Sequence, residues 1–258
     1  MHRIILALII LLALQPLQAQ TPAIPRLLPK VLNVYPHDAA AFTQGLLWDG
    51  GQLYESTGLY GESTLRRVEI ATGETQDLLS LDERYFAEGL ERVGDRLIQL
   101  TWKAGRAFVY DFASFELIDT IEYEGEGWGL CYDGRYLFMS DGSAYLSVRD
   151  ARTFDLIVRA AVTYQGQLLP AQLLNELECV GEWIYANAWN TDFIFRIDKF
   201  TGVITALVDA AALLTDAERA ALQPGSVLNG IAYNPESETF FITGKNWPKM
   251  FEVVFTEP

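Results

Sequence analysis

Side chains that could carry out acid–base chemistry recur at one position of a repeated sequence pattern. The position lies directly before the residue that opens the first strand of each of five predicted hairpins. Its occupants can all donate or accept a hydrogen bond, and they are Gln44, Glu88, Trp128, Asn175 and Asn229. Such a set is unusual for a structural core. It is therefore a candidate binding or catalytic site.

A second set of residues follows the second strand of each hairpin. Its members are Gly58, Trp102, Gly142, Trp189 and Lys245. A hairpin returns its second strand to the end where the first began, so both sets should meet at one face. Aromatic walls with a few converging polar groups are typical of a small-ligand site. Its carboxylate, Glu88, could move a proton, and its ammonium, Lys245, could stabilise a developing negative charge. Taken singly, the tryptophans could serve packing and the glutamate an ion pair.

Two other acidic residues lie near the second set and are alternatives to Glu88. Glu55 comes three residues before Gly58, and Asp141 directly precedes Gly142. Either could orient a substrate or stabilise a strand end. We favour Glu88 because it belongs to the first set.

The elements that must position these residues are short antiparallel strands. Hairpin segments begin at Phe42, Phe86, Gly125, Leu174 and Leu228, and a second hairpin follows four of them. Four strands in every 40 to 54 residues is the spacing of a propeller blade. The sequence therefore predicts an all-β, five-bladed β-propeller that forms a single domain over residues 20–258. A two-sheet sandwich is the alternative.

Two features depart from the hairpin pattern. Residues 213–222 predict one short inserted helix, with Thr215 or Asp216 at its N-cap. Residues 30–34 and 250–255 each predict a strand, and we expect them to pair in one blade. Such pairing would close the ring and remove exposed sheet edges.

The amino-terminal residues predict export. Arg3 precedes an uncharged apolar run from Ile4 to Leu14, and cleavage after Ala19 would remove residues 1–19 as a signal peptide. A retained membrane anchor is the alternative. We expect a periplasmic or secreted protein without a stable membrane partner, most simply a monomer. The formal net charge of −15 argues against nucleic acid as a partner.

Histidine and cysteine are scarce, which limits the possible chemistry. After removal of the signal peptide only His37 remains, so a His-rich zinc site cannot be built. The sequence predicts no metal ligand set and no cofactor. Cys131 lies two positions after Gly129, and Cys179 lies three positions after Glu176, which are the residues that open the first strands of their hairpins. Because strand side chains alternate, we expect them to point to opposite sides of neighbouring inner strands and to remain free thiols.

In addition to these patterns, the chain resembles the plant and bacterial type of glutamine cyclotransferase from about Val31 to Phe255. The resemblance rests on an ordered series of motifs: YPHDAAAFTQGL, LYESTGLYGESTLR, FAEGL, LTW, GWGL, NELE, NAWN, VLNGIAYN and TGKNWPKMFEV. It implies a five-bladed propeller that acts on peptides or proteins with an N-terminal glutamine. Some members of this family are reported with bound metal, but no ligand cluster in this sequence assigns one.

The resemblance also implies roles for individual residues. The family's acidic catalytic residue corresponds to Glu88 in FAEGL. Its pocket residues correspond to Phe42, Gln44, Phe86, Trp102, Trp128, Asn175, Trp189 and Lys245. The implied reaction closes an N-terminal glutamine into pyroglutamate and releases ammonia, with Glu88 as base and then acid. Gln44 and Lys245 would assist catalysis, and the others would bind substrate.

Two other functions are compatible with a propeller. A calcium-dependent lactonase or hydrolase would need a cage of carboxylates and amides, which Glu88, Asn175 and Asn229 could form in part. A non-catalytic propeller could instead bind peptide ends, because fold alone does not determine function.

Overall fold

Short strands joined by tight turns form nearly all of the chain that the computed structural model describes, which is residues 24–170 and 174–258. Three sheets contain four antiparallel strands each. The first holds β2 (Thr43–Asp49), β3 (Gln52–Thr57), β4 (Thr64–Glu69) and β5 (Glu74–Ser80). The second holds β6 (Ala87–Val93), β7 (Arg96–Thr101), β8 (Arg106–Asp111) and β9 (Leu117–Glu122). The third holds β10 (Leu130–Tyr132), β11 (Tyr136–Ser140), β12 (Tyr145–Asp150) and β13 (Leu156–Ala161).

The remaining long strands belong to one eight-stranded sheet. In spatial order they are β16 (Leu174–Val180), β17 (Trp183–Ala188), β18 (Phe193–Asp198), β19 (Ile204–Asp209), β1 (Arg26–Pro36), β22 (Lys249–Thr256), β21 (Thr239–Gly244) and β20 (Leu228–Asn234). A two-stranded sheet contains β14 (Thr163–Tyr164) and β15 (Gln167–Leu168).

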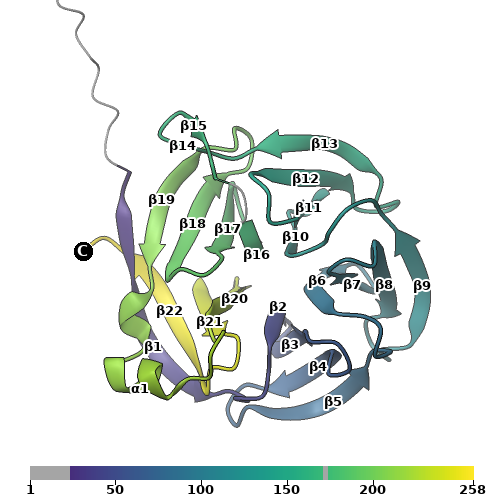
Figure 1. Ribbon diagram of the computed structural model, residues 1–258, viewed down its shortest axis with the longest axis horizontal. Coiled ribbons are helices and arrows are strands. Elements are labelled where there is room, and N and C mark those ends of the chain that lie inside the picture. Colours follow the sequence, from purple (N-terminus) through teal and green to yellow (C-terminus); the bar gives the residue numbers. More distant parts are fainter. Residues whose placement is uncertain (1–23, 171–173) are drawn as a thin grey trace, which may run out of the picture.

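The sheets surround a common centre in a propeller-like arrangement. Figure 1 shows β2, β6, β10, β16 and β20 innermost, with β5, β9 and β13 at the periphery. Buried side chains form apolar clusters between neighbouring sheets, such as Phe138 and Leu146 against Leu177 and Ile184. The prediction of an all-β fold is confirmed.

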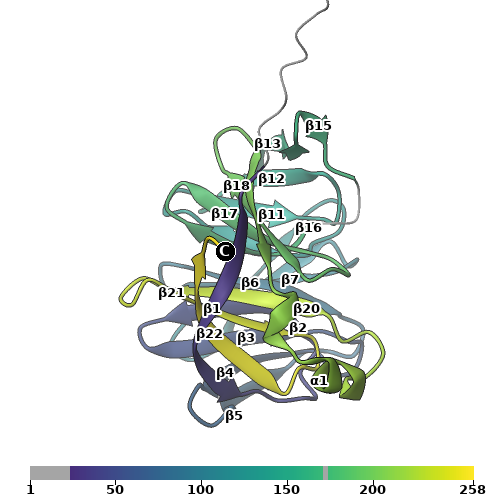
Figure 2. The same ribbon diagram turned by 90° about the vertical axis from the view of Figure 1, so that its left-hand side faces the viewer.

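The two predicted exceptions to the hairpin pattern are present. In β1, Lys30 pairs with Val254 and Val34 with Phe251 of β22, so the predicted pairing is confirmed. The start of β1 also pairs in parallel with β19. Figure 2 shows β1 and β22 side by side, with α1 near one end of them.

The inserted helix is also confirmed. A 3₁₀ turn, η1 (Ala211–Leu213), precedes the short helix α1 (Asp216–Ala221). Thr215 is the N-cap, and it forms a reciprocal capping box with Glu218 that satisfies backbone donors of the first turn.

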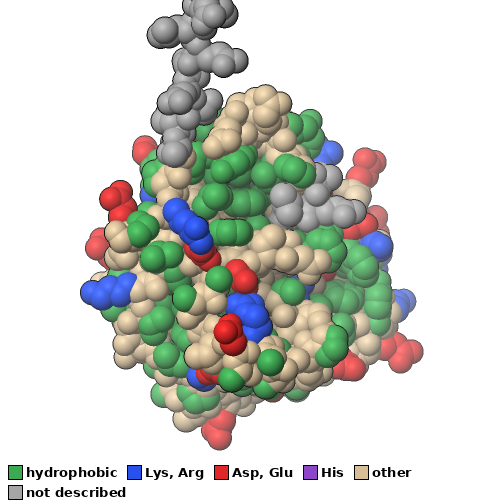
Figure 3. Space-filling model, turned by 60° about the vertical axis from the view of Figure 1, so that its left-hand side comes forward, with side chains coloured by type: hydrophobic (Ala, Val, Ile, Leu, Met, Phe, Trp, Pro, Cys, Tyr) green, Lys and Arg blue, Asp and Glu red, His purple; other side chains and the backbone are tan. Residues whose placement is uncertain are grey.

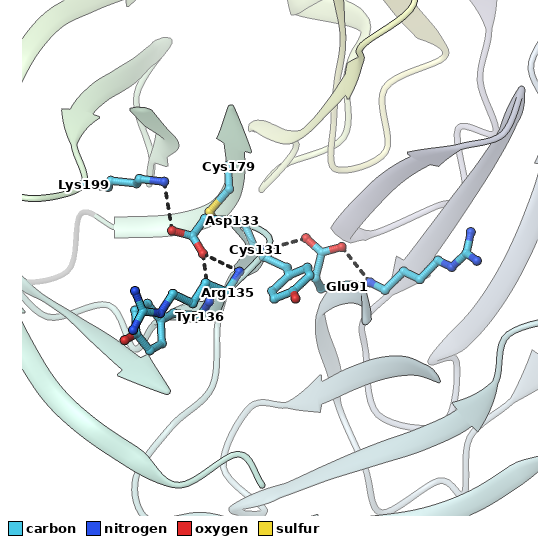
Figure 4. The surroundings of a disulfide bond; sticks show 9 residues. Glu91, Cys131, Asp133, Arg135, Tyr136, Cys179 and Lys199 are labelled. Atoms are coloured by element: carbon cyan, nitrogen blue, oxygen red, sulfur yellow. Dashed lines mark hydrogen bonds and ion pairs between the residues drawn. A yellow bond between two sulfur atoms is a disulfide. The ribbon is translucent and has the colours of Figure 1, made fainter. Parts of the chain in front are cut away.

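The prediction of free cysteines is wrong. Cys131 of β10 and Cys179 of β16 form a disulfide with a Cα–Cα distance of 5.4 Å (Figure 4). The two inner strands belong to different sheets that pack face to face. Side chains on opposite sides of such strands point toward each other across the interface. The expected alternation therefore favours the bond instead of preventing it.

An ion pair joins the same two sheets beside the disulfide. Lys199 donates to Asp133 at 2.9 Å, and Asp133 also accepts from the backbone N–H groups of Arg135 and Tyr136 (Figure 4). The turn after β10 is thus fixed to the sheet that contains β16.

The surface carries both signs of charge. On the face shown in Figure 3, acidic and basic side chains are interspersed and do not form one large patch of a single sign. Within residues 24–170 and 174–258, no helix has the length and apolar character needed to cross a membrane. The predicted signal peptide, residues 1–19, lies outside the described residues.

Candidate active site

The structure contains a cavity of about 250 Å³. Its lining contains all nine residues singled out as the site, namely Phe42, Gln44, Phe86, Glu88, Trp102, Trp128, Asn175, Trp189 and Lys245. The structure therefore brings together seven residues of the two predicted sets, although they are far apart in sequence, whereas Asn229 of the first set does not line the cavity.

Bulges in the inner strands aim three residues of the first set into the cavity. The register of β2 shifts between Thr43 and Gly45, and that of β6 shifts between Ala87 and Leu90. Similar shifts occur in β16 around Asn175 and in β20. A bulge turns one side chain away from the normal alternation. This local irregularity directs Gln44, Glu88 and Asn175 toward the centre.

Glu88 is the buried acid of the cavity. Its Oε1 accepts a hydrogen bond from Gln44 Nε2 at 2.9 Å, and Gln44 in turn accepts one from Asn229 at 3.3 Å. Glu88 Oε2 is buried and has no hydrogen-bond partner in the described part of the chain. Burial raises the pKa of Glu88 well above its usual value, Lys245 opposes this, and Glu126 adds to it. The carboxyl group therefore retains a proton far more readily than an exposed glutamate.

Lys245 supplies the cation. Burial lowers the pKa of its ammonium to about 8, although Glu88 raises it. The ammonium lies 4.8 Å from the centre of the Phe42 ring, where a cation–π attraction operates. The side-chain amide oxygen of Asn175, Oδ1, is buried and also has no hydrogen-bond partner among the described residues.

Aromatic rings form the walls. Phe86 contacts Phe42 and Trp102, with ring centres 6.0 Å and 5.4 Å apart. Trp128 and Trp189 pack edge to face at 5.7 Å.

The two glycines of the second set make room for these walls and do not line the cavity. A Cβ atom at Gly58 would lie 2.3 Å from the Phe86 ring, and one at Gly142 would lie 2.7 Å from the Trp128 ring. In the second set, Trp102, Trp189 and Lys245 line the cavity. Gly58 and Gly142 leave room for the rings of Phe86 and Trp128.

The two alternative acids lie outside the cavity lining. Glu55 is buried and bonded to Arg66 at 2.7 Å and to His37 at 3.1 Å. Burial opposes ionisation, but Arg66 and His37 together lower the pKa of Glu55 to about 2. Asp141 pairs with Arg159 at 2.7 Å. Both acids are thus committed to ion pairs with arginine.

Sequence reasoning missed Glu126, which contacts two of the wall residues. Its Oε2 accepts hydrogen bonds from the indoles of Trp102 and Trp128. A glutamate between two glycines, two residues before a tryptophan of the first set, was the available signal.

A metal centre is not apparent in the described ranges. No three His, Cys, Asp or Glu side chains among residues 24–170 and 174–258 are grouped so that they could hold a metal ion. We assign no chemical step to a metal.

Known proteins match this chain along most of its length. The family model described as glutamine cyclotransferase matches residues 4–255. A glutaminyl-peptide cyclotransferase of Arabidopsis thaliana is 38% identical over 230 residues, which cover 87% of this chain and 70% of the relative. The crystal structure of Myxococcus xanthus glutaminyl cyclase is similar with a TM-score of 0.84 and 39% identity, covering 92% of this chain and all of that one.

Proposed function

The chain belongs to the glutamine cyclotransferase family, and we propose that it converts the N-terminal glutamine of peptides into pyroglutamate with Glu88 as the proton carrier. The observation that carries the role of Glu88 is its position: a buried carboxyl with one unpartnered oxygen shares a cavity with Lys245 and three tryptophans.

The reaction is intramolecular. The α-amine nitrogen of glutamine forms a bond to the side-chain amide carbon, and a tetrahedral intermediate results. The bond from that carbon to the amide nitrogen then breaks, and ammonia leaves. Because an N-terminal amine has a pKa of about 7.7–8.0, a useful fraction is neutral at physiological pH and no strong base is required.

Glu88 would move one proton through both halves of the reaction. Its carboxylate form accepts the proton that the attacking amine loses, and its acid form delivers that proton to the leaving nitrogen. A carboxyl group suits this cycle when its pKa lies near the working pH. Burial raises the pKa of Glu88 well above its usual value, and the Lys245 ammonium opposes this shift.

The other cavity residues would bind and polarise the substrate. Lys245 and the amide of Gln44 can donate hydrogen bonds to the amide oxygen as it gains charge, and one such donor contributes about 3 kcal/mol in other enzymes. The aromatic walls would hold the glutamine side chain folded toward its own amine, which removes most of the conformational cost.

We also infer the wider context of this site. The eight-stranded sheet would consist of two four-stranded blades, one with β16–β19 and the other with β20–β22 and β1. Together with the three four-stranded sheets, these would make five blades in one domain. The disulfide supports an exported, periplasmic or secreted protein, because such bonds persist in oxidising compartments. The expected monomer and the signal peptide remain part of this proposal.

Incubation with a glutamine-leading peptide tests the activity. We expect ammonia release and a matching loss of mass from the peptide. An otherwise identical peptide that begins with asparagine is the control, because its shorter side chain cannot close the same ring. Equal ammonia release from both peptides, or none from either, would refute the proposed reaction.

Glu88→Gln tests the proton carrier. The substitution keeps the size and hydrogen bonding of the side chain but removes its exchangeable acid, so we expect kcat to fall by roughly 100-fold or more. Glu83→Gln is the matched control, since Glu83 is exposed just before β6. Wild-type kcat in Glu88→Gln would remove Glu88 from the mechanism.

A further inference from the structure

The carboxylate of Glu126 joins two walls of the cavity. Its Oε2 accepts a hydrogen bond from Trp102 Nε1 at 2.7 Å and another from Trp128 Nε1 at 3.0 Å. Trp102 follows β7, whereas Trp128 precedes β10 in the neighbouring sheet. One oxygen atom thus fixes indoles that two different sheets contribute.

The loop that carries Glu126 is itself held in place. Gly127 donates from its backbone to the carbonyl oxygen of Trp102 at 3.0 Å. A Cβ atom at Gly127 would lie 2.3 Å from the hydroxyl oxygen of Tyr123, which donates to the carbonyl of Thr101 at 2.6 Å. The loop therefore packs directly against the end of β7. This packing holds the backbone next to Glu126.

Lys103 lies on the other side of the same group. Its ammonium is 3.8 Å from Glu126 Oε1 and 3.9 Å from the centre of the Trp102 ring. Both charged side chains are partly exposed, so solvent screens the ion pair and its contribution to stability is small. The hydrogen bonds to the indoles are the stronger constraint on Glu126.

An indole without a hydrogen-bond partner is poorly fixed in orientation. The torsion that rotates the ring relative to Cβ has broad energy wells, and an indole N–H near an apolar cavity normally requires an acceptor. Removal of the Glu126 carboxylate would leave two donors unpaired beside the substrate. Both rings could then rotate, and the shape of the cavity would no longer match one folded conformation of the substrate.

We propose that Glu126 is a positioning residue, which fixes Trp102 and Trp128 in the orientations that hold the glutamine side chain folded. This role rests on the proposed function. Glu126 acts through the two indoles, and its effect should appear in how productively the substrate is bound.

Three variants separate this role from a general effect of charge. Glu126→Ala removes both hydrogen bonds, whereas Glu126→Gln keeps an amide oxygen that can accept from both indoles. Glu124→Gln is the matched control, since Glu124 is exposed in the same loop. With a glutamine-leading peptide we expect Glu126→Ala to lower kcat/KM by about tenfold. Glu126→Gln should stay within about threefold of wild type, and Glu124→Gln should equal wild type.

An equal loss of kcat/KM in Glu126→Gln and Glu126→Ala would overturn the proposal, because charge and not the acceptor oxygen would then matter. A wild-type value in Glu126→Ala would overturn it as well.

A second measurement does not depend on activity. In protein labelled with ¹⁵N at tryptophan, we expect Glu126→Ala to shift the indole N–H resonances of Trp102 and Trp128 and to speed their exchange with solvent, while Glu124→Gln leaves them unchanged. If wild type releases no ammonia but these resonances respond as expected, the enzymatic function fails and the positioning of the indoles stands. Unchanged indole resonances in Glu126→Ala would overturn the positioning role.

Discussion

Glu88 and Lys245 share one buried cavity, and burial moves their pKa values toward each other. The pKa of the carboxyl group is raised well above its usual value, and the pKa of the ammonium falls to about 8. Each also stabilises the charged form of the other. When two groups interact strongly, the apparent pKa values belong to the pair and not to either residue alone. The pH dependence of the enzyme should therefore report on both residues.

Lys245→Arg tests this coupling. Below pH 8 the Lys245 ammonium is charged and can stabilise the oxyanion. Above that pH the charge is lost, so we expect kcat to fall as the pH rises through about 8. Arginine stays charged throughout this range, so the alkaline decline should disappear in the variant even if the maximum of kcat is lower. Lys30→Arg, at an exposed position of β1, is the control. An alkaline decline at the same pH in Lys245→Arg would contradict this role.

At the residue scale, the repeat predicts most of the cavity lining, whereas Phe42 and Phe86 were implied by the family resemblance. Equivalent positions of successive hairpins meet at the centre of a ring, and this holds whatever the details of each loop. Glu126 was not found in this way, because it occupies neither of the two repeated positions and lies in the loop between β9 and β10. Its contact with two indoles depends on how that loop folds against β7.

At the scale of the strands, the inner strands approach one another unusually closely. A Cβ atom at Gly45 would lie 2.5 Å from the backbone nitrogen of Leu90, and one at Gly89 would lie 2.7 Å from that of Leu130. Both glycines directly follow a residue of the first set. The pairs Gln44–Gly45 and Glu88–Gly89 therefore each do two things. The first residue directs a side chain into the site, and the glycine allows the neighbouring strand to approach closely.

Gly89→Ala should affect both stability and activity. The added methyl group would overlap backbone atoms of the neighbouring inner strand, which cannot yield as a flexible side chain would. We expect a loss of about 2 kcal/mol, or a fall in Tm of roughly 4–8 °C. Because Glu88 is the adjacent residue, kcat/KM should fall as well. Thermal unfolding and peptide turnover check the two effects, and an unchanged Tm would show that the strands can separate without cost.

The cysteines mark the limit of strand-level prediction. The sequence predicts alternating side chains along β10 and β16. What alternation could not supply was the face-to-face stacking of the two sheets, which depends on the packing of side chains from both. Alternation within single strands therefore led to the wrong prediction that Cys131 and Cys179 are free thiols.

At the scale of the whole molecule, the disulfide and the Lys199–Asp133 ion pair fasten two consecutive sheets together. The bond closes a segment with a sequence separation of 48 residues. In the chain-entropy model a loop of that length stabilises the folded state by about 4 kcal/mol.

Reduction should therefore lower the Tm by about 8–16 °C. A double variant, Cys131→Ser with Cys179→Ser, should have a similarly low Tm that a reductant does not change further. Alkylation of denatured protein supplies the independent check, because neither cysteine should react until a reductant is added. Equal Tm values for oxidised and reduced wild type would show that the bond does not stabilise the ring.

The pairing of β1 with β22 also has a consequence for biosynthesis. A ribosome synthesises residues 26–36 long before residues 249–256, yet these two segments are adjacent in the finished sheet. Until β22 has been synthesised, β1 lacks its antiparallel neighbour. The sheet that contains both strands can therefore be completed only at a late stage of folding.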